Sequence, residues 1–140
     1  MTVKGRQSGL ELCGVYSPCD VFSFVGSEDI VSYDGYTVKL TSSRLKTFKK
    51  NCSCVICGRE GEVMLLEGHP NDGSPHFNMY AKDEYGNLIL MTKDHILPKS
   101  MGGADHQENY QTMCCECNWL KANRSVSNEE LRNEISGELR

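Results

Sequence analysis

Alternation of apolar and polar positions dominates the first third of the chain. Residues 14–40 are rich in β-branched and aromatic side chains, which predicts strands, and Asp34-Gly35 is a strong hairpin turn. Residues 1–13 carry few apolar side chains, so we expect them to be loosely held. The N-terminal part of the protein is therefore predicted to be a β-rich arm.

The period changes at the segment SSRLKTFKK, residues 42–50. Leu45 and Phe48 lie three positions apart, as on one face of a helix, and Thr41 or Ser42 can cap the first turn. This pattern predicts a short helix whose remaining surface is basic.

A second hairpin is expected further along the chain. Residues 76–81 and 88–92 predict two strands joined by a turn at residues 83–87, and Asp94-His95 falls at the end of the second strand. Beyond it we expect a Gly-rich loop, a short strand and two helices. These segments are residues 98–108, residues 110–113, a helix from about 114 or 115 to about 123, and a last helix after the capping box at 127–130.

Composition narrows the class of protein. The 140 residues suit one domain, with room for an appended arm, and 39% of them are hydrophobic. No apolar run approaches the roughly 18 to 20 residues needed to cross a bilayer. The first residues lack the apolar stretch of a secretory signal. We therefore expect a cytoplasmic protein with no membrane partner, whose thiols stay reduced.

The net charge of −4 argues against a protein that coats nucleic acid generally. The charge is segregated, however. Residues 39–59 contain six basic side chains and no acidic one, whereas residues 129–138 carry four glutamates. The basic run fits either a solvated helix face or a contact with a DNA backbone.

Eight cysteines are many for this length. Two Cys-x-x-Cys pairs, Cys54 with Cys57 and Cys114 with Cys117, supply four thiolates, which is a ligand set of structural zinc. A glycine directly after the first pair suits the tight turn of a zinc knuckle. The alternative is that some of these cysteines are merely buried thiols.

Groups suited to phosphodiester hydrolysis lie on both sides of the second cysteine pair. His95 can take up a proton near neutral pH, and Asp94 is a hard oxygen ligand for Mg²⁺ or Mn²⁺. Asn118 can offer a neutral oxygen, while Lys121 and Arg124 continue its helix face and could hold phosphates. In an ideal strand Asp94 and His95 point to opposite faces, so they converge only if the backbone bends.

The segment DHILPKSMGGADHQENYQTMCCECNWLKANR, residues 94–124, resembles the HNH endonuclease family in its zinc-stapled ββα-metal form. Residues 76–93 resemble a phage-encoded branch of that family. With the first cysteine pair, the resemblance covers about half of the chain or more. It implies that His95 is the general base and that Asp94 is a ligand of the catalytic metal.

The resemblance also implies roles for two asparagines. Asn109 matches the central motif asparagine, which ties the loop and orients the histidine rather than touching metal. Asn118 stands where the last motif histidine is expected, a substitution that also occurs in the family and is compatible with metal binding.

Three other residues have two interpretations each. Lys99, in the loop after His95, is a further phosphate contact that we weigh evenly against a solvated side chain. His106 is expected to be an exposed loop histidine, and Trp119 to pack beneath its helix, with stacking on a base as the alternative.

We therefore predict an α+β fold with a small ββα-metal, treble-clef-like HNH core at residues 51–125, stapled by a four-cysteine zinc site. A β-rich arm with a short basic helix precedes it at residues 1–50, and a C-terminal acidic helix follows at residues 126–140. The expected function is metal-dependent nicking or double-strand cutting of DNA, with structural Zn²⁺ and catalytic Mg²⁺ or Mn²⁺. The arm and the acidic tail could also mediate a homodimer.

Two other functions are weighed against this prediction. A non-catalytic zinc module could bind nucleic acid or protein, although binding alone has no need of the Asp94-His95 pair. A redox protein using its Cys-x-x-Cys pairs would be expected to show a βαβ setting, which the pattern lacks.

Overall fold

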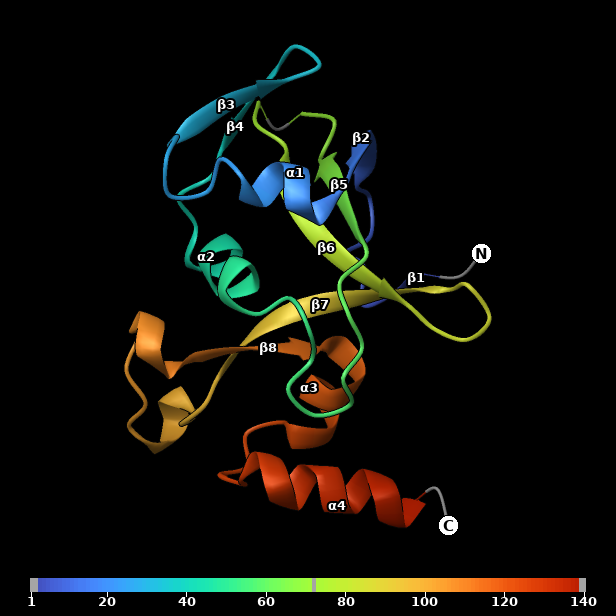
Figure 1. Cartoon of the computed structure of the whole chain (residues 1–140), viewed down its shortest axis with the longest axis vertical. Helices are drawn as coiled ribbons and strands as arrows, with labels where there is room; N and C mark the ends of the chain where they lie inside the picture. The colour runs from blue at the N-terminus through green and yellow to red at the C-terminus, as the bar shows by residue number, and fades with distance from the viewer. Residues whose placement is uncertain (1–2, 72, 139–140) are drawn as a thin grey trace.

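A six-stranded sheet organises the residues that the computed structural model describes, which are 3–71 and 73–138 (Figure 1). The strand order is β1-β7-β6-β5-β2, and β8 pairs with β7 beyond this path. The strands are β1 (Val3–Lys4), β2 (Glu11–Tyr16), β5 (Val63–Gly68), β6 (His76–Lys82), β7 (Leu88–His95) and β8 (Tyr110–Cys114). A separate hairpin joins β3 (Ile30–Tyr33) to β4 (Tyr36–Lys39).

Strand β7 connects the two halves of the sheet because its ends have different partners. Its first residues pair with β6 and, in parallel, with β1, whereas its last five pair antiparallel with β8. Helix α3 (Cys115–Lys121) follows β8 directly and contacts both β7 and β8. Two antiparallel strands and a helix thus form one consecutive unit at the end of β7.

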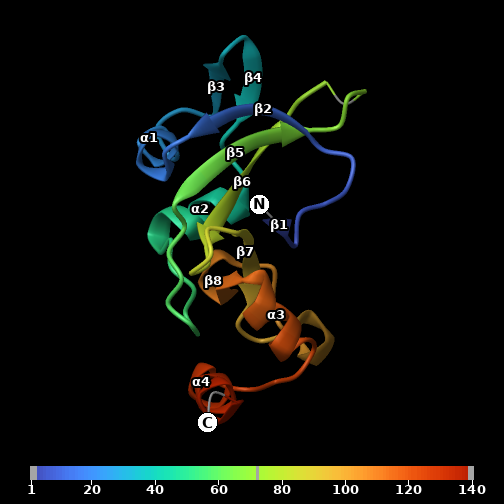
Figure 2. The ribbon, with the colours of Figure 1, turned by 90° about the vertical axis from the view of Figure 1, so that its right-hand side faces the viewer.

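Two short helices lie on one side of the strands, as Figure 2 shows for α1 (Pro18–Phe22) and α2 (Ser43–Lys50). The α2 prediction is confirmed, since the Ser42 side chain caps the helix at Leu45 N, 3.1 Å away. At α1, however, the strand predicted from residues 14–40 is wrong. Pro18 takes the first helical turn, where its missing N–H costs nothing, and the helix buries Val21.

Three other outcomes concern the strands. The hairpin turn at Asp34-Gly35 and the β6–β7 hairpin are confirmed. Strand β5, which we did not predict, lies between β2 and β6, and three of its side chains reach the core, so its apolar run shows no clean alternation. The expectation of a loosely held N-terminus is wrong where it can be judged, because β1 and the start of β2 belong to the sheet; residues 1–2 lie outside the described residues.

The core lies between the sheet and helices α1 and α2. Its fully buried side chains include Phe48 of α2 and the methionines of four strands, Met64, Met79, Met91 and Met113. The last helix, α4 (Asn128–Glu138), begins at the predicted capping box and buries Leu131. The fold is therefore mixed α+β, with β1 and β2 of the predicted arm in the same sheet as the later strands and β3 and β4 in a hairpin of their own. No helix within the described ranges has the length and apolar character to span a membrane.

Candidate functional site

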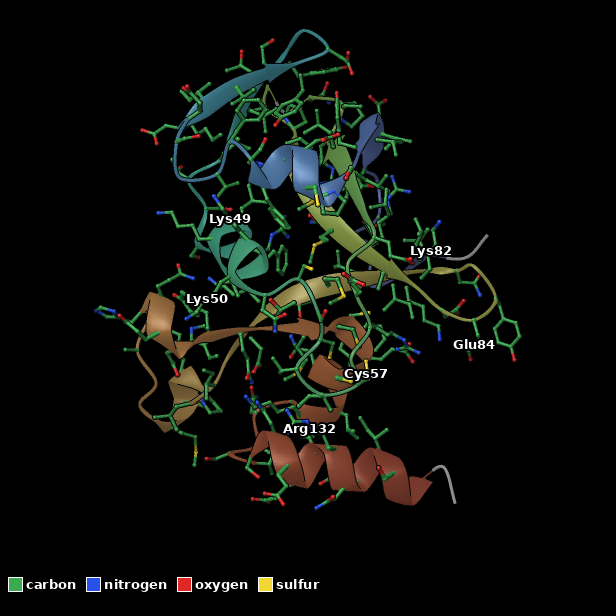
Figure 3. All side chains as sticks on the ribbon, viewed as in Figure 1. Lys49, Lys50, Cys57, Lys82, Glu84 and Arg132 are labelled. Carbon is green, nitrogen blue, oxygen red and sulfur yellow. The ribbon has the colours of Figure 1, made fainter. Side chains whose placement is uncertain are left out.

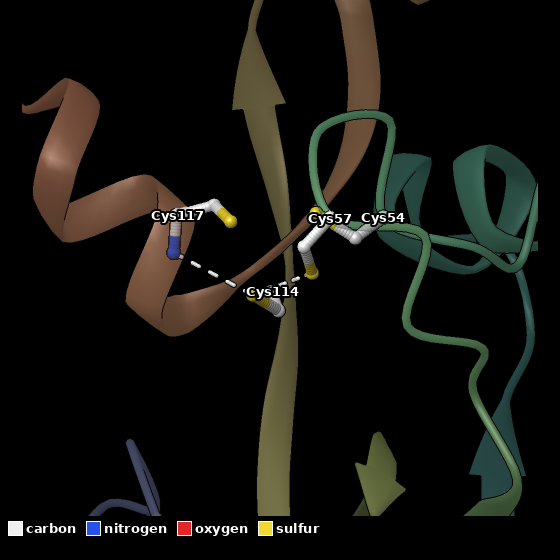
Figure 4. Close-up of side chains that lie close together, drawn as sticks. All are labelled: Cys54, Cys57, Cys114 and Cys117. Atoms are coloured by element: carbon white, nitrogen blue, oxygen red, sulfur yellow. Dashed lines mark hydrogen bonds between the residues drawn. The ribbon is translucent and has the colours of Figure 1, made fainter. Parts of the chain in front are cut away.

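Four cysteine thiols converge at the start of α3. The sulfur atoms of Cys54, Cys57, Cys114 and Cys117 all lie within 4.8 Å of one another, and two of them, on Cys57 and Cys114, are 3.7 Å apart (Figure 4). Four sulfurs at about 2.3 Å from a tetrahedral zinc ion would be about 3.8 Å apart. The cluster therefore has the ligand type and the spacing that a zinc ion needs.

Local backbone structure presents each pair of thiols. After Cys57 the chain turns through Gly58, whose φ of 81° is favourable only for glycine, and Gly58 N donates to Cys54 O at 3.0 Å. At the other pair, Cys114 ends β8 and caps α3, with Cys117 N donating to its sulfur at 3.5 Å. A knuckle and a helix start thus face each other across the cluster.

The four thiols of the cluster are coupled, so that the pKa values of Cys54 and Cys57 are lowered and those of Cys114 and Cys117 are raised. Hydrogen bonds from the other three thiols, first that of Cys114, hold the pKa of Cys54 far below its ordinary value. Arg59 Nη1 lies 3.8 Å from the Cys114 sulfur and 2.9 Å from Glu116 Oε1. This cation, which the sequence analysis did not single out, offsets part of the charge that four thiolates would gather. The sequence signal that could have identified Arg59 is its position, two residues after the first cysteine pair.

A second site lies where β7 ends. Asp94, His95 and Asn118 line one surface hollow of about 390 Å³, which the turn at Lys99 and Ser100 also borders. The two neighbours on β7 leave opposite faces of the strand, as expected, because Asp94 pairs across to Gln111 and His95 to Tyr110. They nevertheless reach the same hollow, because the chain turns away directly after His95.

A buried ion pair holds Asp94. Lys121, whose side chain is 1% exposed, donates to Asp94 Oδ2 at 2.7 Å, and Gln111 Nε2 donates to the same oxygen at 3.0 Å. Lys121 also donates to the carbonyl oxygens of His95 and Ile96, at 2.7 Å and 3.2 Å. The expectation that Lys121 contacts phosphate therefore needs correction, because its ammonium group is enclosed and supports the turn after β7.

His95 is oriented by a carboxylate that the sequence analysis did not single out. Its Nε2 atom lies 2.8 Å from Asp105 Oδ1, and its ring packs edge-on against Tyr110 with centroids 5.1 Å apart. Hydrogen bonds from Lys99 and then His95 lower the pKa of Asp105 to about 2. The carboxylate is thus ionised at neutral pH and can only accept, so Nε2 carries the proton. Nδ1 makes no hydrogen bond to any described residue, and the His95 side chain is 25% exposed.

Asn109 ties together the loop between β7 and β8. Its side chain accepts from Leu97 N at 2.9 Å and donates to Leu97 O at 3.0 Å and Ala104 O at 2.9 Å. The loop is closed so tightly that a Cβ on Gly103 would lie 1.8 Å from Leu97 O. Asn109 and the glycine together hold Asp105 at the position from which it reaches His95.

Asn118 faces the same hollow from α3. Its Nδ2 atom donates to Thr92 Oγ1 at 2.8 Å, which fixes the amide and leaves its Oδ1 for another partner. Asp94 Oδ1 is likewise without a hydrogen bond in the described part of the chain. Two oxygen donors at one hollow fit a cation such as Mg²⁺, which usually keeps several waters and takes few protein ligands.

The remaining predicted residues lie around these sites. Lys99 is 65% exposed at the rim of the hollow, where it pairs with Asp105 at 2.8 Å. Arg124 makes two hydrogen bonds to Glu134 of α4, at 2.9 Å and 3.0 Å. Trp119 is 62% exposed, so its predicted packing beneath the helix is wrong.

Comparison with known proteins bears on the second site. Residues 83–134 match the family model described as HNH endonuclease. This HNH match spans β7, the loop, β8, α3 and the first part of α4, and it includes every residue of the hollow. It supports the HNH family and a nuclease function in general, and residues 1–82 and 135–140 lie outside it. No curated protein and no solved structure matches the chain.

Proposed function

We propose that this protein is an HNH endonuclease of the ββα-metal type that hydrolyses phosphodiester bonds of DNA. The observation that carries the proposal is the hollow at the end of β7, where Asp94, His95 and Asn118 meet inside the HNH match. The hollow offers a base and two oxygen ligands within one ββα unit. These are the groups that hydrolysis of a phosphodiester requires.

His95 acts as the general base through Nδ1. Asp105 accepts a hydrogen bond from the Nε2–H group and so keeps the ring in the tautomer with a free lone pair at Nδ1. That nitrogen takes a proton from water as the water oxygen attacks phosphorus, and the bond from phosphorus to the 3′-oxygen breaks. Asp105 then stabilises the imidazolium that forms, so it is a positioning residue for the base.

Asp94 and Asn118 would hold one divalent cation, Mg²⁺ or Mn²⁺. When bound, such a cation stabilises the charge on the phosphate and on the leaving 3′-oxygen. Hydrogen bonds from Lys121 and Gln111 fix the direction of the carboxylate, and the hydrogen bond to Thr92 fixes the amide. Both ligands are therefore organised before the substrate arrives.

The four-cysteine cluster would hold a structural zinc ion. It joins the 54–57 knuckle to the start of α3, which carries Asn118 one residue after the last cysteine. A zinc ion there would fix the helix, and hence Asn118, relative to β7. Lys99 is an exposed cation that pairs with the same carboxylate as His95, and it would bind a substrate phosphate in place of Asp105.

The test is nicking of supercoiled plasmid by the zinc-loaded full chain, with Mg²⁺, with Mn²⁺ and without added divalent cation. We expect metal-dependent relaxation that His95→Ala abolishes. His106→Ala is the matched control, because this histidine lies in the same loop, is 75% exposed and pairs only with Glu108 among the described residues. It should retain nicking.

An Asp105→Asn variant separates the base from its positioning partner. An asparagine can present either an oxygen or an N–H to Nε2, so the tautomer is no longer enforced and kcat falls while DNA affinity is kept. If folded, zinc-loaded wild-type protein leaves plasmid DNA uncut with either metal, or if His95→Ala cuts as well as wild type, the proposed function is wrong.

A further inference from the structure

Helix α2 carries exposed cations that the proposed reaction does not use. Lys46 and Lys50 lie four residues apart, on the same face of the helix, and both are exposed. Like charges at this spacing repel each other and weaken an isolated helix. An anion lying along this face would relieve that repulsion.

The orientation of this face is fixed by contacts of Arg44 and Thr47, which lie three residues apart on α2. Arg44 donates to Asn78 Oδ1 at 2.7 Å and to the Phe77 carbonyl, which anchors the helix to β6. Thr47 Oγ1 accepts from Gln107 Nε2 at 2.8 Å, which joins the helix to the loop between β7 and β8. The helix is therefore held against the unit that contains His95.

A continuous path leads from α2 to the base. Ser43 Oγ accepts from Lys93 Nζ at 2.9 Å, and Lys93 lies two residues before His95, on the same face of β7. The ring of Tyr110 lies between them, 4.0 Å from the Lys93 ammonium and 5.1 Å from the His95 ring centre. Lys93 also borders the hollow, so cationic groups extend from the hollow to α2.

Two acidic side chains of the loop between β7 and β8 lie near this path. Asp105 is bound by Lys99 and His95. The exposed Glu108 hydrogen-bonds to His106 at 2.9 Å, and this hydrogen bond together with the charge of Lys50 lowers the pKa of Glu108. In Figure 3, Lys50 lies at the side of α2 that is close to the loop between β7 and β8, whereas Lys82 of β6 lies across the molecule. Glu108 offsets part of the charge of Lys50, whereas Lys46 makes no ion pair in the described part of the chain, so a net positive charge on this face is left for a large anion.

We propose that the exposed face of α2 binds the sugar-phosphate backbone of duplex DNA on one flank of the scissile phosphate, through Lys46 and Lys50. The proposal rests on the proposed function and extends the substrate site beyond the HNH match. Lysines reach phosphates as point charges and carry no base information, so these contacts add affinity and orientation without sequence preference.

The experiment measures binding of a fluorescein-labelled duplex by anisotropy, using full-length, zinc-loaded His95→Ala protein without added Mg²⁺ or Mn²⁺. Lys46→Gln with Lys50→Gln is compared with Lys82→Gln, an exposed lysine on the far side. Loss of two phosphate contacts should make the negative slope of the logarithm of the association constant against the logarithm of salt concentration shallower by about 1.8. Binding should weaken roughly 10- to 60-fold near 0.1 M salt. Lys82→Gln should change neither quantity.

Cleavage kinetics with His95 intact distinguish failure of this proposal from failure of the proposed endonuclease function on which it rests. The double variant should raise KM for plasmid DNA much more than it lowers kcat, with unchanged circular dichroism. If wild type cuts DNA but the double variant binds with the same affinity and salt slope as Lys82→Gln, α2 is not a DNA contact and the endonuclease stands. If the wild-type protein does not cut DNA but the Lys46→Gln, Lys50→Gln substitutions weaken duplex binding, the endonuclease proposal is wrong and the α2 surface stands.

Discussion

Removing either partner of the buried pair of Lys121 and Asp94 should destabilise this fold strongly. The two side chains are 1% and 9% exposed, and their charged atoms are 2.7 Å apart. Removing one partner of such a pair leaves an uncompensated charge away from water, which typically costs about 3–5 kcal/mol. Lys121→Met removes the cation with little change in side-chain volume, so we expect the free energy of unfolding to fall by about that amount.

A double-mutant cycle isolates the interaction itself. Asp94→Asn should cost less, about 1–3 kcal/mol, because Lys121 keeps two carbonyl acceptors on the turn after β7. Combining the two substitutions removes both charges. The double variant should therefore be more stable than the sum of the single effects predicts, by about 1.5–3 kcal/mol.

The assay is urea unfolding followed by far-UV circular dichroism at one fixed free zinc concentration, since bound metal adds to the apparent stability. Lys82→Met is the control, because the same substitution on the surface should stay within about 0.5 kcal/mol of wild type. A loss below about 1 kcal/mol for Lys121→Met, or additive single effects, would refute the reasoning that this contact is a desolvated ion pair.

Three further predictions concern the loop and the cluster. In Lys99→Met the pKa of Asp105 should rise from about 2 towards its ordinary value, because the hydrogen bond from Lys99 is the main cause of the shift; carboxyl-carbon NMR titration measures it, and an unmoved pKa contradicts the pairing. Because the pKa of Asp105 is lower in the folded protein than its ordinary value, its ion pair stabilises the fold at neutral pH, and this stabilisation is lost as pH falls through about 2. Asn109→Ala should accelerate hydrogen exchange at Leu97 N and lower kcat with little change in DNA affinity, whereas protection equal to wild type would mean that the loop does not depend on this amide. Removal of zinc by a strong chelator should abolish most far-UV dichroism, because structural zinc contributes roughly 10 to 16 kcal/mol to the folding free energy of small zinc domains. Metal analysis should find zinc in the wild-type protein and not in Cys114→Ser. A metal-free, folded wild-type protein would exclude the zinc site.

Local signals in the sequence were sufficient for much of the secondary structure. The Asp34-Gly35 turn, the Ser42 cap and the strand that ends at His95 depend on neighbours within a few residues, and all three are found in the structure. The two cysteine pairs were also readable, because each pair presents its thiols through its own local turn. Strand β5 and helix α1 were missed, the first because a strand covered by others shows no alternation, the second because the proline at its start was not weighed.

The tertiary structure alone decided how the reactive groups are used. Sequence placed Lys121 on the helix face of Asn118 and suggested a phosphate ligand, but packing of α3 against β7 encloses it beside Asp94. Likewise, nothing in the spacing of Asp105 shows that the loop folds back to bring it to His95. Hydrogen bonds and charge pairs between distant residues depend on the packing that brings them together and removes water from between them. The residue types were therefore set by sequence, and their partners by the fold.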